Sequence, residues 1–224
     1  MGTIEAHTRR SEFAGFEAGA WLFVRLVLGA EWVRGGLEKV GQAGWTEPPL
    51  GRSVSGFLKG AIAKSTEGAH PEVPHWYHTV AEQVLLPNAE LLGILVSYGE
   101  VLVGIALVLG FLTRIAALGG VTMNLAFLWA GTTSTNPPML LLGVALVLFG
   151  TEAGRFGLDR WVIPQAEAWL PPGFGRVLPS VMLGLAVIAA GALALAVTDT
   201  ATWAGLLAFT LIATIGATWR HRSL

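Results

Sequence analysis

The chain has 224 residues, of which 53% are hydrophobic and only 13% are charged. An ordinary soluble domain carries about 25% charged residues, so this composition indicates an integral membrane protein. The formal net charge of -1 gives no basic excess for a nucleic-acid partner. The sequence contains no cysteine, which excludes disulfides, thiolate metal sites and cysteine-ligated iron–sulfur clusters within this chain.

Six apolar runs predict an all-α integral membrane fold. The first is read as a retained helix, because the N-terminal segment has acidic residues after its arginines and no clear small-residue cleavage site. The fourth is short for a full span, and a re-entrant segment is the alternative there. The predicted spans are roughly Phe16 to Lys39, Pro87 to Gly110, Arg114 to Ala130, Pro138 to Gly150, Val177 to Val197 and Ala201 to Trp219.

These spans divide the chain into three parts. Residues 1–160 are predicted to form a four-helix transmembrane bundle, 161–176 a cytoplasmic linker, and 177–224 a C-terminal transmembrane hairpin. If the six spans alternate in direction, eight arginines fall on one side, which the positive-inside rule makes cytoplasmic together with both termini. These arginines are Arg9, Arg10, Arg114, Arg155, Arg160, Arg176, Arg220 and Arg222.

The long loop between the first two spans, residues 41–86, is then extracytoplasmic and is predicted to be structured. Its apolar residues follow the i, i+3, i+4 spacing of an amphipathic helix that would lie on the bilayer or cover the bundle. A second short helix is predicted from Pro74 to Pro87. The residues that carry the amphipathic pattern are Val54, Phe57, Leu58, Ala61 and Ile62.

Two charged residues interrupt apolar runs where lipid is expected. Arg25 lies in the first span and Glu100 in the second, at similar counted depths, and Asn124 lies at that depth in the third. Because an ionisable group within the bilayer is costly and usually functional, we expect Arg25 and Glu100 to meet. Either they form an ion pair that fixes helix register, or they bind and protonate a polar ligand head, with Glu100 exchanging the proton.

A second polar group is predicted at the outer end of the first helix. Glu31, Arg34 and Glu38 share one stripe before Lys39. One interpretation is a solvated helix end with spaced ion pairs. The other is an anion site with Arg34 and Lys39 at its rim, covered by the loop that contains Trp45.

Aromatic and histidine residues leave further alternatives open. Trp129 and the turn after it fit either an interfacial aromatic belt or one wall of a quinone-ring pocket. His75 and His78 have the spacing of metal ligands, although a helix end at the surface is the simpler interpretation, and we expect no metal site. No histidine lies within a predicted span, so haem held by a pair of membrane histidines is not expected, and there is no nucleotide fingerprint for a flavin.

Three segments resemble the DoxX superfamily of small membrane proteins, specifically its DoxD branch. The similarity is strongest from Gly99 to Arg114 and covers about residues 15 to 162, and the long loop favours DoxD over shorter DoxX proteins. It places Arg25, Lys39, Glu100, Arg114 and Asp159 at recurrent family positions. The segments are LVLGAEWVRGGLEKV after Arg25, SYGEVLVGIALVLGFLTRIAAL from Ser97, and NPPMLLLGVALVLFG with GLDRW from Asn136.

The resemblance implies the large subunit of a thiosulfate:quinone oxidoreductase in a prokaryotic cytoplasmic membrane, working with a smaller subunit, DoxA. Thiosulfate would be oxidised to tetrathionate and a quinone, as substrate, would be reduced. A homo-oligomer is also compatible with the glycines of the predicted hairpin. The alternatives are a membrane scaffold for soluble redox partners and a small-solute or lipid carrier that uses the same polar core. The fold alone does not decide among these.

Overall fold

The computed structural model describes residues 2–68 and 71–169, and all regular elements in this part are helices. A π turn, Ala81–Leu85, and two 3-10 turns, Leu86–Asn88 and Gly154–Phe156, join some of them. The helices are α1 Gly2–Leu37, α2 Arg52–Lys64, α3 His75–Val80, α4 Ala89–Leu109, α5 Thr113–Trp129, α6 Asn136–Ala153 and α7 Asp159–Trp169.

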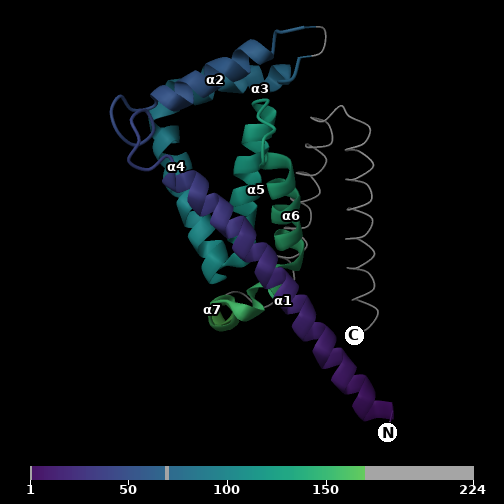
Figure 1. The fold of residues 1–224 in the computed structure, drawn as a ribbon. Helices are drawn as coiled ribbons and strands as arrows, with labels where there is room; N and C mark the ends of the chain where they lie inside the picture. Colours follow the sequence, from purple (N-terminus) through teal and green to yellow (C-terminus); the bar gives the residue numbers. More distant parts are fainter. Residues whose placement is uncertain (1, 69–70, 170–224) are drawn as a thin grey trace.

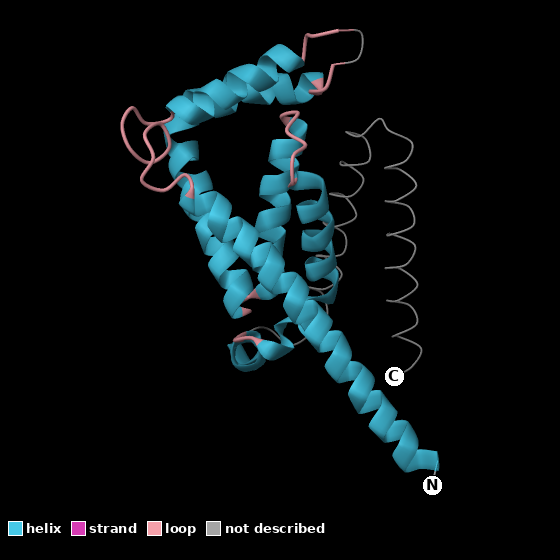
Figure 2. Cartoon of the chain, in the orientation of Figure 1, coloured by secondary structure: helices cyan, strands magenta, loops and turns pink. Residues whose placement is uncertain are grey.

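Helices α1, α4, α5 and α6 form a bundle in which α1 crosses the others obliquely (Figure 1). Helix α1 packs mainly on α4, and α5 packs mainly on α6. Helices α2 and α3 cover one end of this bundle, and α7 lies at the opposite end (Figures 1 and 2). We refer to these as the α2 end and the α7 end.

Helix α4 shows most directly how the sequence produces a membrane fold. Its inward face consists of small or polar residues at Gly93, Ser97, Glu100 and Gly104, all buried, as their helical spacing predicts. Its outward face is large and apolar, which is the reverse of a soluble helix and fits contact with lipid. The exposed residues recur every three or four positions, at Leu91, Leu95, Tyr98, Leu102, Ile105 and Leu109.

Two helical stretches in the described part, His75–Leu109 and Asn136–Phe156, are long and apolar enough to cross a membrane. Their most apolar 18-residue segments have mean hydropathies of 2.2 and 1.6. The 21 residues of α4 alone would extend about 30 Å, the thickness of the hydrocarbon core. The described residues are therefore all-helical and consistent with a helical membrane protein. Six spans are not tested, because the predicted hairpin 177–224 lies outside the described residues.

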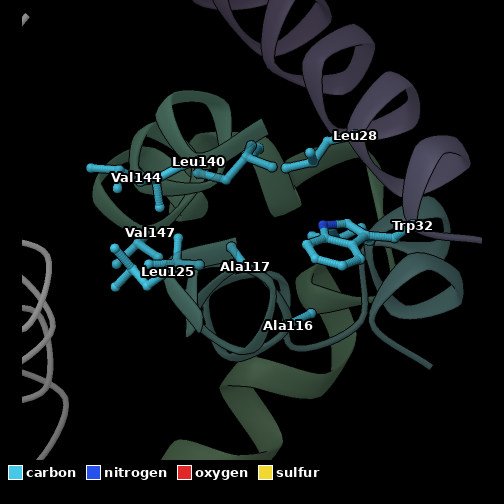
Figure 3. Close-up of a cluster of buried hydrophobic side chains, with 12 residues drawn as sticks. Leu28, Trp32, Ala116, Ala117, Leu125, Leu140, Val144 and Val147 are labelled. Atoms are coloured by element: carbon cyan, nitrogen blue, oxygen red, sulfur yellow. The ribbon is translucent and has the colours of Figure 1, made fainter. Parts of the chain in front are cut away.

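The core of the bundle lies where α1, α5 and α6 meet (Figure 3). Trp32 points from α1 toward α5, beside Ala116 and Ala117, while Leu28 points toward Leu140 of α6. Alanine and glycine on α5 leave room for this indole. A Cβ at Gly120 would lie 2.9 Å from Trp32 Nε1, so that position accepts glycine alone without a shift.

Several element boundaries differ from the sequence predictions. The fourth span is longer than Pro138 to Gly150, because α6 begins at Asn136 and continues to Ala153 through a kink at Phe149. The predicted helix from Pro74 to Pro87 is not separate, since its turns lead directly into α4. The first nine residues of the predicted linker 161–176 belong to α7, which contains Pro164, and residues 170–176 lie outside the described part.

Candidate functional site

A buried ion pair links the end of α1 to the middle of α4. The Lys39 ammonium lies 2.6 Å from Oε2 of Glu100 and also donates a hydrogen bond of 2.8 Å to the Gly35 carbonyl. The Glu100 side chain is only 3% exposed, whereas that of Lys39 is 21% exposed. Lys39 therefore connects a carboxylate inside the bundle with a more accessible position at its edge.

Glycines on α1 make this pair possible. A Cβ at Gly36 would lie 2.7 Å from the backbone nitrogen of Val101, so only glycine lets α1 approach α4 this closely. Lys39 lies just beyond the end of α1 at Leu37, where the free carbonyls at the helix C-terminus favour a cation. The fold thus brings a basic residue that follows one helix back onto an acidic residue in the middle of another.

Beside this pair lies a cavity of about 390 Å³ at the α2 end of the bundle. Most of its wall is apolar, and Glu100 with Lys39 supplies a charged part. The Trp45 ring forms another part of the wall, with the Lys39 ammonium 5.4 Å from its centroid. The remaining apolar lining includes Trp32, Val54, Phe57, Leu58, Leu85, Leu92, Val96, Phe127 and Met139.

The predicted stripe at the end of α1 also reaches the cavity, because Glu31 and Arg34 line it. Arg34 is paired with acidic neighbours on its own helix: its guanidinium lies 2.7 Å from Glu31 and 2.7 Å from Glu38. These pairs are exposed, and Lys39 is engaged by Glu100. The two cations proposed for an anion rim therefore already have acidic partners.

The expected contact between Arg25 and Glu100 is wrong. Glu100 is bound by Lys39, and a Cβ at Gly35 would lie 3.4 Å from its Oε2. Arg25 lies ten residues before Gly35 on the same helix, which is about 15 Å along the axis. The depth count failed because α1 is tilted and because Lys39, beyond the end of the helix, reaches back into the bundle.

Arg25 instead stabilises the α7 end of the bundle. The residue is 1% exposed, and its guanidinium donates hydrogen bonds to the carbonyls of Ala153 at 3.1 Å and Phe156 at 3.4 Å. It passes so close to Gly110 and Gly157 that neither could carry a Cβ without a shift. Arg25 therefore binds one carbonyl at the end of α6 and one in the 3-10 turn that follows it, and it does not line the cavity.

Asp159 completes this end of the fold. Its carboxylate accepts hydrogen bonds from the backbone N–H groups of Leu112, at 2.6 Å, which precedes α5, and of Thr113, at 2.9 Å, the first residue of α5. A carboxylate at a helix N-terminus satisfies free N–H groups and favours the helix dipole. Arg25 and Asp159 thus have a structural explanation that does not involve a ligand.

The two remaining predicted residues lie near the cavity without lining it. Asn124 is buried in α5 at 1% exposure. The ring of Trp129 packs edge-on against Trp76, with centroids 5.0 Å apart, and does not form part of the wall. The turn after Trp129 does, through Thr132, Ser134, Thr135 and Asn136.

Sequence reasoning missed the role of Trp32, which lines the cavity and packs against α5. It lies seven residues after Arg25, so the helical spacing that drew attention to Arg25 would have placed it on the same face.

No group of three or more metal-ligating residues occurs within residues 2–68 and 71–169. His78 contacts Ser65 Oγ at 2.5 Å and Glu82 at 3.4 Å.

One comparison with known proteins finds a family. The family model described as "TQO small subunit DoxD" matches residues 21–171, about two thirds of the chain. TQO denotes thiosulfate:quinone oxidoreductase. The match agrees with the DoxD resemblance but corrects the subunit, which the resemblance gave as the large one. No solved structure matches this chain.

Proposed function

The chain belongs to the DoxD family of membrane proteins, and from this premise we propose that its cavity is the quinone-reducing site of a thiosulfate-oxidising enzyme. Two thiosulfate dianions would join through a new S–S bond to give tetrathionate and release two electrons. The quinone would take up these two electrons and two protons to become the quinol. We propose a DoxA-type subunit as the partner in this reaction.

The observation that carries the proposal is the Lys39–Glu100 pair in the wall of an otherwise apolar cavity. Ligand pockets of about 300 to 1,000 Å³ commonly combine an apolar wall with a few polar groups that orient the ligand. An apolar wall suits the ring and first tail units of a quinone. The charged pair supplies the polar group that a ring oxygen requires.

The charge of the cavity favours a neutral ring over a sulfur dianion. Its charged lining residues are two acids, Glu31 and Glu100, and two bases, Arg34 and Lys39, so their formal charges sum to zero. Both bases already contact carboxylates. A dianion would have to displace those carboxylates, whereas a neutral ring would not. We therefore assign the cavity to the quinone and place thiosulfate at another surface or at the partner.

Glu100 is the proposed proton donor to the reduced ring. It is buried, so it can deliver a proton without admitting bulk water, and Lys39 offers a path from the more exposed edge. A proton would move from the Lys39 ammonium to the Glu100 carboxylate, and from there to a ring oxygen. Lys39 would then regain a proton from the solvent side.

The first prediction is that Glu100→Gln abolishes quinone reduction while quinone still binds. Glutamine keeps the size and a hydrogen bond but cannot exchange a proton, and loss of a general acid typically costs about 100-fold or more in rate. The measurement is thiosulfate-dependent reduction of decylubiquinone by the purified full chain with its DoxA-type partner. Glu90→Gln, an exposed glutamate on the same helix, is the matched control and should keep the activity.

Binding of decylubiquinone separates chemistry from folding. We expect the affinity of Glu100→Gln to stay within a few fold of the original chain, with only the turnover lost. Full turnover in Glu100→Gln would remove the proposed proton donor and favour a scaffold for a redox partner. Binding without any thiosulfate-dependent turnover in the original complex would favour a carrier.

A further inference from the structure

Deep in the bundle, α1 and α5 each bury a polar side chain with atoms that have no hydrogen-bond partner among the described residues. These are the indole Nε1 of Trp32 on α1 and both amide atoms, Oδ1 and Nδ2, of Asn124 on α5. Trp32 is 3% exposed and Asn124 is 1% exposed. A buried polar group without a partner costs about 1 to 3 kcal/mol, so three such atoms at one place call for an explanation.

The two side chains lie on facing surfaces of their helices. Trp32 Nε1 lies 2.9 Å from the position that a Cβ on Gly120 would take. Asn124 follows Gly120 by four residues, so it lies on the same face of α5, and the Cβ positions are about 6 Å apart. Figure 3 shows the Trp32 ring directed from α1 toward α5 beside Ala116 and Ala117.

One of the two residues reaches the cavity. Trp32 forms part of its wall. Phe127, three residues after Asn124 and on the same helix face, forms another part. Asn124 itself does not line the cavity, and its amide is closed off from it in this structure, so a ring oxygen would reach the amide only after the Trp32 or Phe127 side chain moves.

We propose that Trp32 and Asn124 form an inner subsite that binds one oxygen of the quinone ring, while Glu100 and Lys39 serve the other. This inference rests on the proposed function and deepens it. A ring carbonyl would accept hydrogen bonds from Trp32 Nε1–H and Asn124 Nδ2–H. When the ring is reduced, Glu100 would protonate the outer oxygen, and the inner oxygen, then an anion, would keep its hydrogen bonds from Trp32 and Asn124. Its own proton would follow through Lys39 and Glu100 as the quinol leaves the cavity.

The chemistry of the amide is the reason for assigning this ligand. The asparagine amide and the indole each offer an N–H donor, which a ring oxygen can accept both as a carbonyl and as the anionic oxygen of the reduced ring. A leucine would fill the same space in a membrane core without the desolvation cost. The two unpartnered N–H donors therefore point to an occupant that brings an acceptor oxygen.

The test is the affinity of decylubiquinone together with the infrared carbonyl bands of the bound ring, labelled with carbon-13 at one carbonyl at a time. The full-length protein in nanodiscs is used throughout. Two substitutions remove inner donors: Asn124→Leu, and Trp32→Phe, which keeps an aromatic ring and removes the N–H. Thr122→Val is the matched control on α5, since Thr122 is exposed and donates only to the Leu118 carbonyl of its own helix.

We expect Asn124→Leu to weaken binding by about tenfold, the size of one or two neutral hydrogen bonds. One labelled carbonyl band should move to higher frequency, toward its position in the free ring, and the other should stay. Trp32→Phe should move the same band by a smaller amount. Thr122→Val should change neither the affinity nor the bands.

The outcomes separate this inference from the proposed function. If both carbonyl bands are unchanged in Asn124→Leu and Trp32→Phe, the inner subsite is overturned, even where turnover still depends on Glu100. If both bands move equally, the residues act through packing and the subsite is also overturned. If the original protein binds no decylubiquinone, the quinone site and its inner subsite fail together.

Discussion

The Lys39–Glu100 pair places two opposite charges at 2.6 Å in an apolar part of the fold. Removing charges from water is costly, and mutual attraction offsets that cost only while both partners are present. Such a pair need not stabilise the fold relative to two apolar residues. Removal of one partner, however, leaves the other as a buried charge without compensation. The pair is therefore best tested by substituting each partner alone and then both together.

We predict that Lys39→Met lowers the free energy of unfolding by about 3 kcal/mol, because it leaves the Glu100 carboxylate without its cation. The double variant Lys39→Met with Glu100→Gln should recover most of that loss. Thermal unfolding in detergent, followed by circular dichroism, measures both. Lys59→Met, an exposed lysine on α2, is the control and should change stability little.

Equal instability of the single and the double variant would show that Lys39 acts through packing or through its bond to the Gly35 carbonyl. The ion pair would then not determine the stability of this region. Recovery in the double variant, combined with lost quinone reduction, would show that the same pair is dispensable for folding and required for chemistry.

The sequence predicted which residues are unusual better than it predicted which of them meet. Glu31, Arg34, Lys39, Trp45 and Glu100 were all candidates and all line one cavity. The predicted partner of Glu100, Arg25, was wrong because depth in the membrane was counted along ideal spans. Such a count ignores helix tilt and the length of a side chain that lies beyond a helix end. A cation chosen by depth alone was therefore the wrong one.

At the scale of elements, α1 and α4 are held close by glycines that face each other. A Cβ on Gly104 would lie 2.5 Å from the Val33 nitrogen and 2.7 Å from the Gly29 carbonyl oxygen. Both are backbone atoms, which cannot rotate away as a side chain can. Because the two helices approach this closely, Gly36 lies against Val101 and Lys39 reaches Glu100. The same approach therefore positions the cavity wall.

We predict that Gly104→Ala lowers the free energy of unfolding by about 2 kcal/mol, as expected when extra volume forces packed helices apart. It should also weaken decylubiquinone binding, because α1 and α4 both contribute to the cavity wall. Thermal unfolding and quinone affinity are the two measurements. Gly99→Ala is the control on the same helix, since its Cβ would meet only Met123 Sδ at 3.8 Å, an ordinary contact.

A Gly104→Ala variant as stable as the original chain would mean that α1 and α4 can separate at little cost, and the glycine face would lose its explanation.

The small-residue face of α4 was predictable from spacing alone, because helical periodicity determines which residues share a side. The continuous run from α3 into α4 was not, because Pro87 normally signals a boundary. Here Pro87 lies in a 3-10 turn within the run, which continues past it.

For the whole molecule, the two ends of the bundle differ in charge and in role. The α7 end carries Arg155 and Arg160, both exposed, and the buried Arg25 that fastens α6. The α2 end holds the cavity, and its loop mixes acidic and basic residues. The positive-inside rule therefore predicts that the α7 end faces the cytoplasm and that the cavity lies near the opposite surface.

Because the sequence has no cysteine, single cysteines can report this orientation without background. We predict that Lys59→Cys, on the exposed side of α2, reacts in intact cells with a maleimide that cannot cross membranes. Arg155→Cys, exposed at the α7 end, should react only after the cells are permeabilised. Labelling is measured as a mass shift of the purified protein, and each of the two cysteine variants serves as the control for the other. The reverse pattern would place the cavity near the cytoplasmic surface, so that protons for the quinone would be drawn from the cytoplasm through Lys39 instead of from outside.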